Sequence, residues 1–160
     1  MTVRRWTAVA VLAAFACSEP SSGPRTLLRD TGVQTSASVS RTSIEPGQET
    51  ELTVTLANPT SEPVTLHFGS GCQVVAYVTD HAGTVIAPAG GGWVCVAVLT
   101  QLTLGPGETK TYTWGWAGGS DFASQLSQAG SEPPGNYYFY ATMAAAEGTY
   151  DTPKFLVTLQ

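Results

Sequence analysis

The sequence has few charged side chains, and few of these are positive. Charged residues make up 12% of the 160, about half the roughly 25% of an average soluble protein. Seven Lys and Arg face twelve Asp and Glu, for a net charge of −5. A nucleic-acid surface needs clustered cations to displace counterions from phosphate, and docking on anionic lipid needs a basic patch. The composition therefore argues against both kinds of partner.

Long apolar runs are also lacking. The one near the N-terminus, Ala8–Ala16, is uncharged and follows Arg4 and Arg5, but it is far short of the ~20 residues that span a bilayer. A short positive region before a short apolar run is typical of an export signal. We expect residues 1–16 to be a signal peptide. Without its two arginines, five cations face twelve acids, a net charge of −7.

Cysteine is scarce, and the first of the three follows this run directly. Cys17 comes after the small residues Ala14 and Ala16 and before a polar tract. The arrangement resembles a bacterial lipoprotein signal, in which the cysteine becomes the lipidated first residue, although Ala14 stands where such signals usually carry Leu. The alternative is an ordinary cleaved signal. We expect an exported protein anchored by lipid on Cys17, on the periplasmic or extracellular face, and otherwise secreted.

The rest of the chain divides into a tether and one domain. Residues 17–32 are poor in apolar side chains and predict a flexible tether. Residues 33–160 alternate short apolar runs with Gly, Pro, Asn and Asp, and no stretch of 11 residues shows a helical period. This is typical of an all-β sandwich or barrel. The period-two alternation predicts strands over 35–42, 50–57, 63–68, 73–79, 84–87, 94–103, 109–115, 136–143 and 152–159.

Several segments, taken in order, resemble the BsuPI-type intracellular proteinase inhibitor domain over about residues 45 to 160. They are Asn58–Gly71, Tyr77–Asp80 with Gly83, Leu104–Glu108 followed by Tyr112 and Trp114, and Pro134–Tyr137. The resemblance implies an immunoglobulin-like antiparallel β-sandwich, of about seven to nine strands here, and an inhibitor of proteinases. The chain departs from the family after Gly83, where an aromatic-rich strand is usual, and in carrying Cys72 and Cys95.

Cys72 and Cys95 predict a disulfide. Both follow the export signal, so they would meet an oxidising compartment. Their pairing leaves Cys17 as the odd cysteine, as the lipid anchor requires. The alternatives are a free thiol nucleophile and a metal-binding pair.

No catalytic or metal-binding set stands out. The two histidines, His67 and His81, lie in a strand and a turn, and Ser70 is not in a nucleophile elbow. A site made of Asp80, His81 and a serine is conceivable, but the sequence shows no nucleophile elbow or other supporting pattern. A hydrolase is therefore the least favoured hypothesis. Neither histidine follows Cys95 as a blue-copper site needs, and the acidic residues Glu45, Glu49 and Glu51 lack a calcium-loop spacing. We expect no catalytic residues, metal or cofactor.

The candidate binding features are loops and aromatic side chains. The loop Gly90, Gly91, Gly92 and Trp93 and the long loop Ala117–Pro134 are candidate binding loops. Tyr138 and Tyr140 face outward and form either a binding patch or a cross-strand pair that covers itself. The favoured function is a non-enzymatic sandwich that binds another protein, and a protease is the candidate partner that the family resemblance implies. The alternative is a structural or assembly module of the cell envelope without a discrete ligand.

Overall fold

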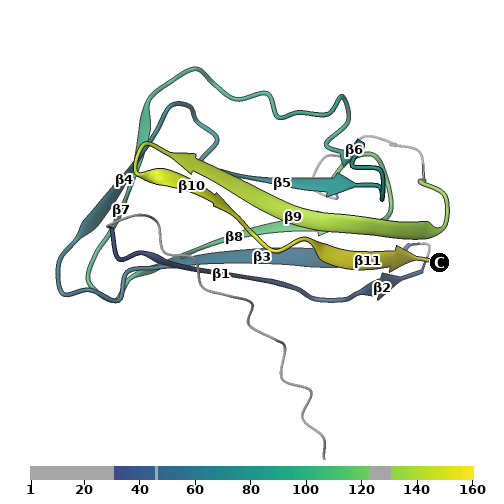
Figure 1. Ribbon diagram of the computed structural model, residues 1–160, viewed down its shortest axis with the longest axis horizontal. Coiled ribbons are helices and arrows are strands. Elements are labelled where there is room, and N and C mark those ends of the chain that lie inside the picture. The colour runs from purple at the N-terminus through teal and green to yellow at the C-terminus, as the bar shows by residue number, and fades with distance from the viewer. Residues whose placement is uncertain (1–30, 46, 123–130) are drawn as a thin grey trace, which may run out of the picture.

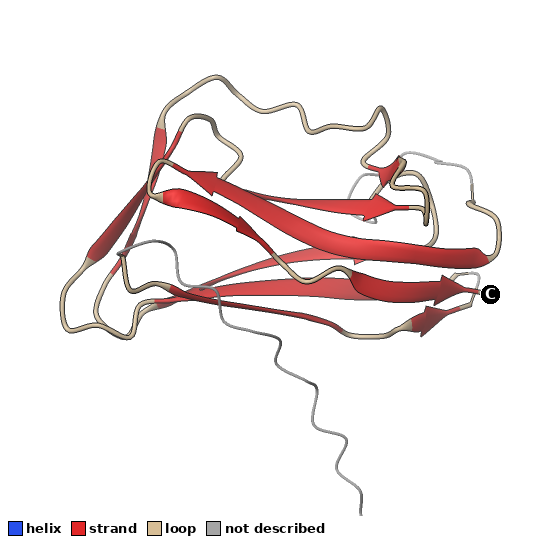
Figure 2. Cartoon of the chain, in the orientation of Figure 1, coloured by secondary structure: helices blue, strands red, loops and turns tan. Residues whose placement is uncertain are grey.

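The computed structural model describes residues 31–45, 47–122 and 131–160. This part of the chain folds as two layers of β-strands joined by loops, without a helix (Figures 1 and 2). It therefore contains no helix that could cross a membrane. The strands are β1 (Gln34–Val39), β2 (Ser43–Ile44), β3 (Thr50–Ala57), β4 (Val64–Phe68), β5 (Val74–Thr79), β6 (Val85–Ala87), β7 (Thr100–Leu104), β8 (Thr109–Trp116), β9 (Gly135–Ala145), β10 (Gly148–Asp151) and β11 (Phe155–Leu159).

The two sheets confirm the predicted all-β sandwich. One sheet has the order β1-β3-β8, and all its pairs are antiparallel. The other runs β2-β11-β9-β4-β7, with β5 and β10 also paired to β9 and β6 paired to β5. Its pairs are antiparallel except for the short parallel contact of β2 with β11. The sheets do not close into a barrel. The described residues form eleven strands where seven to nine were expected, because the two-residue strand β2 and the hairpin strand β10 count separately.

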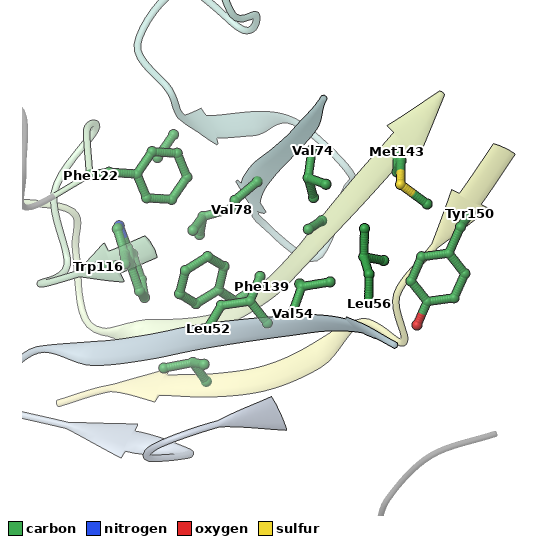
Figure 3. Close-up of a cluster of buried hydrophobic side chains, with 14 of the residues drawn as sticks. Leu52, Val54, Leu56, Val74, Val78, Trp116, Phe122, Phe139, Met143 and Tyr150 are labelled. Carbon is green, nitrogen blue, oxygen red and sulfur yellow. The ribbon is translucent and has the colours of Figure 1, made fainter. Parts of the chain in front are cut away.

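Alternating side chains from β3 and β9 fill the space between the layers. Leu52, Val54 and Leu56 of β3 are fully buried, and Phe139 and Met143 face them from β9 (Figure 3). Successive strand residues point to opposite faces, so the intervening threonines of β3 remain partly exposed. The inward phase predicted for the odd-numbered residues of β9, from 137 to 143, is confirmed.

The turns follow from proline and glycine where tight turns need them. In the connection from β7 to β8, Glu108 donates its backbone N–H to the Gly105 carbonyl at 3.0 Å. Gly107 has a φ of 71°, a conformation that L side chains rarely adopt. Buried Asn58 fixes the neighbouring turn, because its Nδ2 donates to the carbonyls of Glu62, Leu104 and Gly105 at 2.8, 2.9 and 3.1 Å.

Two predicted strand ranges are wrong at one end. The strand expected over 94–103 begins only at Thr100, because residues 94–99 are held beside the β4–β5 connection instead of pairing in a sheet. The strand expected over 152–159 begins at Phe155, since Pro153 has no N–H to donate to a ladder. The chain before it forms β10, which pairs with the end of β9.

The predicted signal peptide, Cys17 and nearly all of the tether lie outside the described residues.

Candidate protein-binding site

Exposed aliphatic side chains gather in one short segment of the described chain. Val94 is fully exposed, and Val96, Val98 and Leu99 are 72%, 49% and 84% exposed. The other exposed large hydrophobic side chain among the described residues is Leu156 of β11, at 46%. We call Val94–Leu99 the apolar segment. It lies in the connection from β6 to β7, which crosses the top of the view in Figure 1, away from the strands.

Trp93 anchors the start of the apolar segment. Its Nε1–H donates to the Ala76 carbonyl of β5 at 2.7 Å. Its ring stacks on Phe122 with centroids 5.5 Å apart, and Phe122 stacks on Phe139 in the core at 5.8 Å. The predicted binding loop therefore turns its aromatic side chain toward the core and not outward.

The predicted disulfide holds the middle of the apolar segment. Cys72 and Cys95 are bonded, with Cα atoms 5.5 Å apart, so this prediction is confirmed. Beside it, the Gly71 N–H donates to the Val96 carbonyl at 2.9 Å, and the Val98 N–H donates to the same oxygen at 2.9 Å. The backbone here is tied to the β4–β5 connection while the side chains of residues 96, 98 and 99 remain exposed.

The far end of the apolar segment is fixed where β7 begins. Thr100 pairs with Phe68 of β4, and its Oγ1 donates to the Ser70 carbonyl at 2.7 Å. The segment thus has fixed points at its start, its middle and its end. Exposed side chains on a fixed backbone are suited to insertion into a partner's cleft.

The glycines before Trp93 form a turn. Gly90 and Gly91 have φ values of 83° and 80°, and the Gly91 N–H donates to the Pro88 carbonyl at 3.1 Å. A Cβ built on Gly90, Gly91 or Gly92 would meet nothing within 4 Å. These residues are exposed, and their role in binding stays a prediction.

The two outward tyrosines of β9 are half-buried. Tyr140 stacks on Tyr77 of the neighbouring strand with centroids 5.7 Å apart, and the Lys154 Nζ lies 4.8 Å from its ring centroid. Burial, followed by the charges of Tyr77 and Asp151, raises the pKa of Tyr140. Tyr140 therefore has a cross-strand partner, and binding by Tyr138 and Tyr140 stays a prediction. Of the other candidate loop, Ala117–Pro134, residues 123–130 lie outside the described chain.

A pocket of about 300 Å³ lies beside the Asp80–Gly83 turn and includes Asp80, His81, Glu132 and Tyr137 in its lining. The Asp80 carboxylate accepts the N–H groups of Ala82 and Thr84 at 2.9 and 2.8 Å, and the Thr84 bond is the main cause of its lowered pKa. The Tyr137 hydroxyl donates to the Pro133 carbonyl at 2.7 Å. The residues that line this pocket, all within the described chain, include no serine, threonine or cysteine nucleophile.

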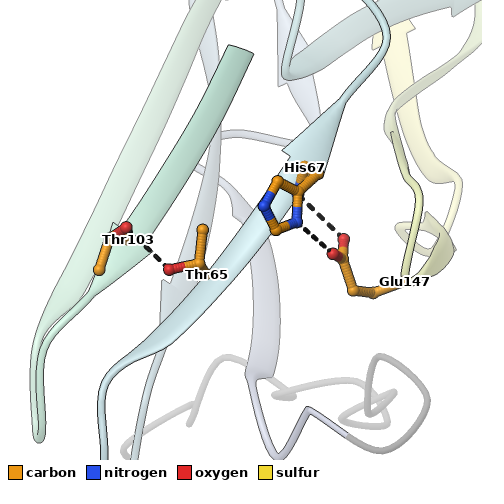
Figure 4. A network of polar contacts seen from close by, with 4 residues as sticks. All are labelled: Thr65, His67, Thr103 and Glu147. Atoms are coloured by element: carbon orange, nitrogen blue, oxygen red, sulfur yellow. Dashed lines mark hydrogen bonds and ion pairs between the residues drawn. The ribbon is translucent and has the colours of Figure 1, made fainter. Parts of the chain in front are cut away.

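His67 has a partner that the sequence did not indicate. Its ring Nδ1 and backbone N–H bind the two carboxylate oxygens of Glu147, at 2.7 and 3.0 Å (Figure 4). The hydrogen bond from the ring, then that from the backbone, lowers the pKa of Glu147. Glu147 lies in the β9–β10 turn, so the pair fastens this hairpin to β4. In the described residues no group of three His, Cys, Asp or Glu is placed to hold a metal ion.

The sequence profile of one family matches most of the sandwich. This family, BsuPI, is described as intracellular proteinase inhibitor, and it matches residues 37–148. The chain belongs to the BsuPI family. The matched region contains both disulfide cysteines and the whole apolar segment, so the family resemblance is confirmed for the part of the chain that carries the candidate site. A search of curated proteins finds no match.

Solved structures resemble the BsuPI domain only in fold. A β-glucosidase from Listeria innocua in complex with gluconolactone has 16% identity and a TM-score of 0.43, over 79% of this chain and 16% of that one. The DNA glycosylase AlkC from Pseudomonas fluorescens has 15% identity and a TM-score of 0.45, over 81% and 31%. A CARDB domain from Pyrococcus furiosus has 16% identity and a TM-score of 0.42, over 81% and 90%. The chain thus spans about a sixth of the glucosidase, and these likenesses carry no functional argument.

Sequence reasoning missed the apolar segment as a candidate site. It assigned these residues to a strand, because a short run of Val and Leu is also what a buried strand looks like. The available signal was the cysteine inside the run, because its expected partner, Cys72, lies in the β4–β5 connection and not in a strand.

Proposed function

We propose that this protein is an exported, non-enzymatic proteinase inhibitor held at a membrane surface by lipid on Cys17. The observation that carries the proposal is the family match over residues 37–148. The exposed, anchored apolar segment inside the matched region supports it, because a binding surface needs side chains left free for a partner.

The Cys72–Cys95 disulfide bears on where the protein works. Disulfides persist in oxidising compartments, while cytosolic thiols are kept reduced. The bond therefore suggests an extracytoplasmic location for this member of a family described as intracellular. The charged start, short apolar run and Cys17 of the sequence are consistent with export and a lipid anchor.

Inhibition is tested on protein that is purified after export, with the disulfide formed. A panel of elastase, chymotrypsin and trypsin is titrated with the protein, and residual hydrolysis of a small chromogenic peptide is measured. We expect at least one protease to be inhibited at micromolar protein. Circular dichroism of the same sample must show a β-rich spectrum. A folded, oxidised sample that inhibits none of the three contradicts the proposal and favours the envelope module without a discrete ligand.

The lipid anchor is tested separately by membrane fractionation and mass spectrometry. We expect the protein in the membrane fraction to begin at a lipid-modified Cys17, and Cys17→Ser to move it to the soluble fraction. Ser18→Ala is the matched control and should stay with the membrane. An unmodified Cys17 in protein from the membrane fraction rules the anchor out and leaves the proposed inhibition standing.

A further inference from the structure

The apolar segment is the strongest unexplained feature of the described surface. Soluble proteins expose single apolar side chains freely, but a contiguous exposed group marks a binding surface. Val94, Val96 and Leu99 are all more than 70% exposed within six residues.

Building on the proposed function, we propose that Val94–Leu99 enters the active-site cleft of the target protease. We further propose that this protease has a primary specificity pocket for aliphatic side chains.

The fixed points of the segment favour an inhibitor over a passive loop. Binding orders flexible groups at a cost in free energy, and rigidity before binding lowers that cost. Here the start is held by the Trp93–Ala76 hydrogen bond, the middle by the Cys72–Cys95 disulfide and the end by the Thr100–Ser70 hydrogen bond. Of the bonds within the segment, only a cut between Val94 and Cys95 would leave the two pieces joined by the disulfide, because Cys72 and Cys95 both precede every later bond.

The uncharged sequence on both sides of the segment selects the kind of pocket. No Asp, Glu, Lys or Arg stands between Asp80 and Glu108 in the sequence. A trypsin-type pocket has an aspartate at its base and takes a basic side chain, while an elastase-type pocket is small and apolar. The aromatic side chain next to the segment, Trp93, is bound to the core and does not serve a chymotrypsin-type pocket. Val, Ala and Leu side chains match the elastase type.

The backbone bonds indicate which residues are free to enter the pocket. The Val96 carbonyl already accepts two N–H groups, from Gly71 and Val98. Val94 and Leu99 lie on either side of this bonded point and are the most exposed, at 100% and 84%. They are therefore the positions to change.

A second copy of the chain fits the segment less well than a cleft does. A stable twofold interface buries about 800 Å² on each partner and must be self-complementary. The connection that carries the segment instead stands clear of the strands in Figure 1, which suits a concave partner.

The test compares two segment variants with a matched surface variant. Val94→Asp and Leu99→Asp place a charge on the segment, and Leu156→Asp places the same charge on the exposed aliphatic residue of β11. Inhibition constants are measured for elastase, chymotrypsin and trypsin with the full oxidised chain. We expect elastase to be inhibited most strongly. At least one segment variant should be tenfold weaker or more, and Leu156→Asp within twofold of the starting protein. Thermal unfolding confirms that each variant is folded.

The remaining outcomes separate the two proposals. If the starting protein inhibits elastase and both segment variants inhibit it equally well, the segment is not the inhibitory one, and the proposed function stands. If trypsin is inhibited and elastase is not, the aliphatic pocket is wrong. If the protein inhibits none of the three, or is cleaved in the segment without inhibiting, both proposals fail. Sedimentation that shows a dimer abolished by Leu99→Asp, with inhibition unchanged, assigns the segment to self-association and overturns the inference.

Discussion

Removing the disulfide tests whether it stabilises the domain as its place in the fold implies. The double variant Cys72→Ala with Cys95→Ala opens a covalent loop whose ends are separated by 23 residues. In the chain-entropy treatment, closing a loop of this length removes about 3 kcal/mol of conformational freedom from the unfolded state. Both cysteines are only half-buried, so the lost sulfur packing adds little to this figure. We expect the free energy of unfolding to fall by about 3 kcal/mol.

The measurement is urea unfolding followed by the fluorescence of the domain's tryptophans. The midpoint should fall and the slope should rise, because the unfolded chain without the cross-link is less compact and exposes more surface. In a thermal scan the same loss lowers Tm by roughly 10 °C for a domain of this size. The starting protein in dithiothreitol is the control and should unfold like the variant.

Two results would refute the reasoning. A loss below about 1 kcal/mol would mean that the unfolded chain is already restricted near residues 72–95, so the loop-entropy model fails here. A reduced starting protein that unfolds as the oxidised one does would mean that the bond adds nothing.

A further consequence separates stability from binding: at a temperature where the variant is still folded, inhibition should weaken, since the segment has lost its middle anchor.

Three further changes have expected outcomes. Trp93→Ala should lower the free energy of unfolding by about 2 kcal/mol, because the ring is partly buried and stacked on Phe122. Trp93→Phe keeps a stacking ring but loses the hydrogen bond to the Ala76 carbonyl. It should lower the free energy of unfolding, measured in urea, by about 1 kcal/mol. Asn58→Ala should cost about 3 kcal/mol, since it leaves buried backbone groups without the amide that joins them, whereas exposed Glu62→Ala should cost under 0.5 kcal/mol. The pKa of Glu147 is lowered in the folded state, so its contribution is present above the unfolded pKa and is lost as pH falls through the folded pKa. Glu147→Gln should therefore flatten the decline in the free energy of unfolding below about pH 4.5. The effect should be under 1 kcal/mol, because the pair is exposed. Glu62→Gln is the control and should leave the decline unchanged, so identical pH profiles for the two variants would contradict this.

The strands that could be predicted are those whose side chains face two different environments. In β3, Leu52, Val54 and Leu56 are buried while the threonines between them are not, so the period of two is visible in the sequence. The same holds for the buried phase of β9, from Tyr137 to Met143. The turn at Gly105–Glu108 could be predicted because proline and glycine restrict the backbone locally.

Contacts between distant parts of the sequence were beyond such reasoning. The bond between His67 and Glu147 joins residues 80 positions apart, and neither residue type indicates its partner. The contact of Trp93 with Phe122 depends on how the β6–β7 connection passes Ala76 of β5, whose carbonyl accepts the Trp93 Nε1–H. The pairing of Cys72 with Cys95 could be predicted because the chain offers so few cysteines.

Because the apolar side chains of Val94–Leu99 stay exposed, folding does not gain the free energy that burying them would give. Burying a Val or Leu side chain gains about 1.5–3 kcal/mol, and the segment leaves four of them exposed. The same anchors prevent its collapse: Trp93 occupies the adjacent site on the core, and the disulfide with the Gly71–Val96 bond holds the backbone off the sheet. An uncharged apolar stretch is also an aggregation hazard. A partner that covers these side chains recovers the free energy that folding leaves unused, so the strength of binding should follow how many of the four it buries.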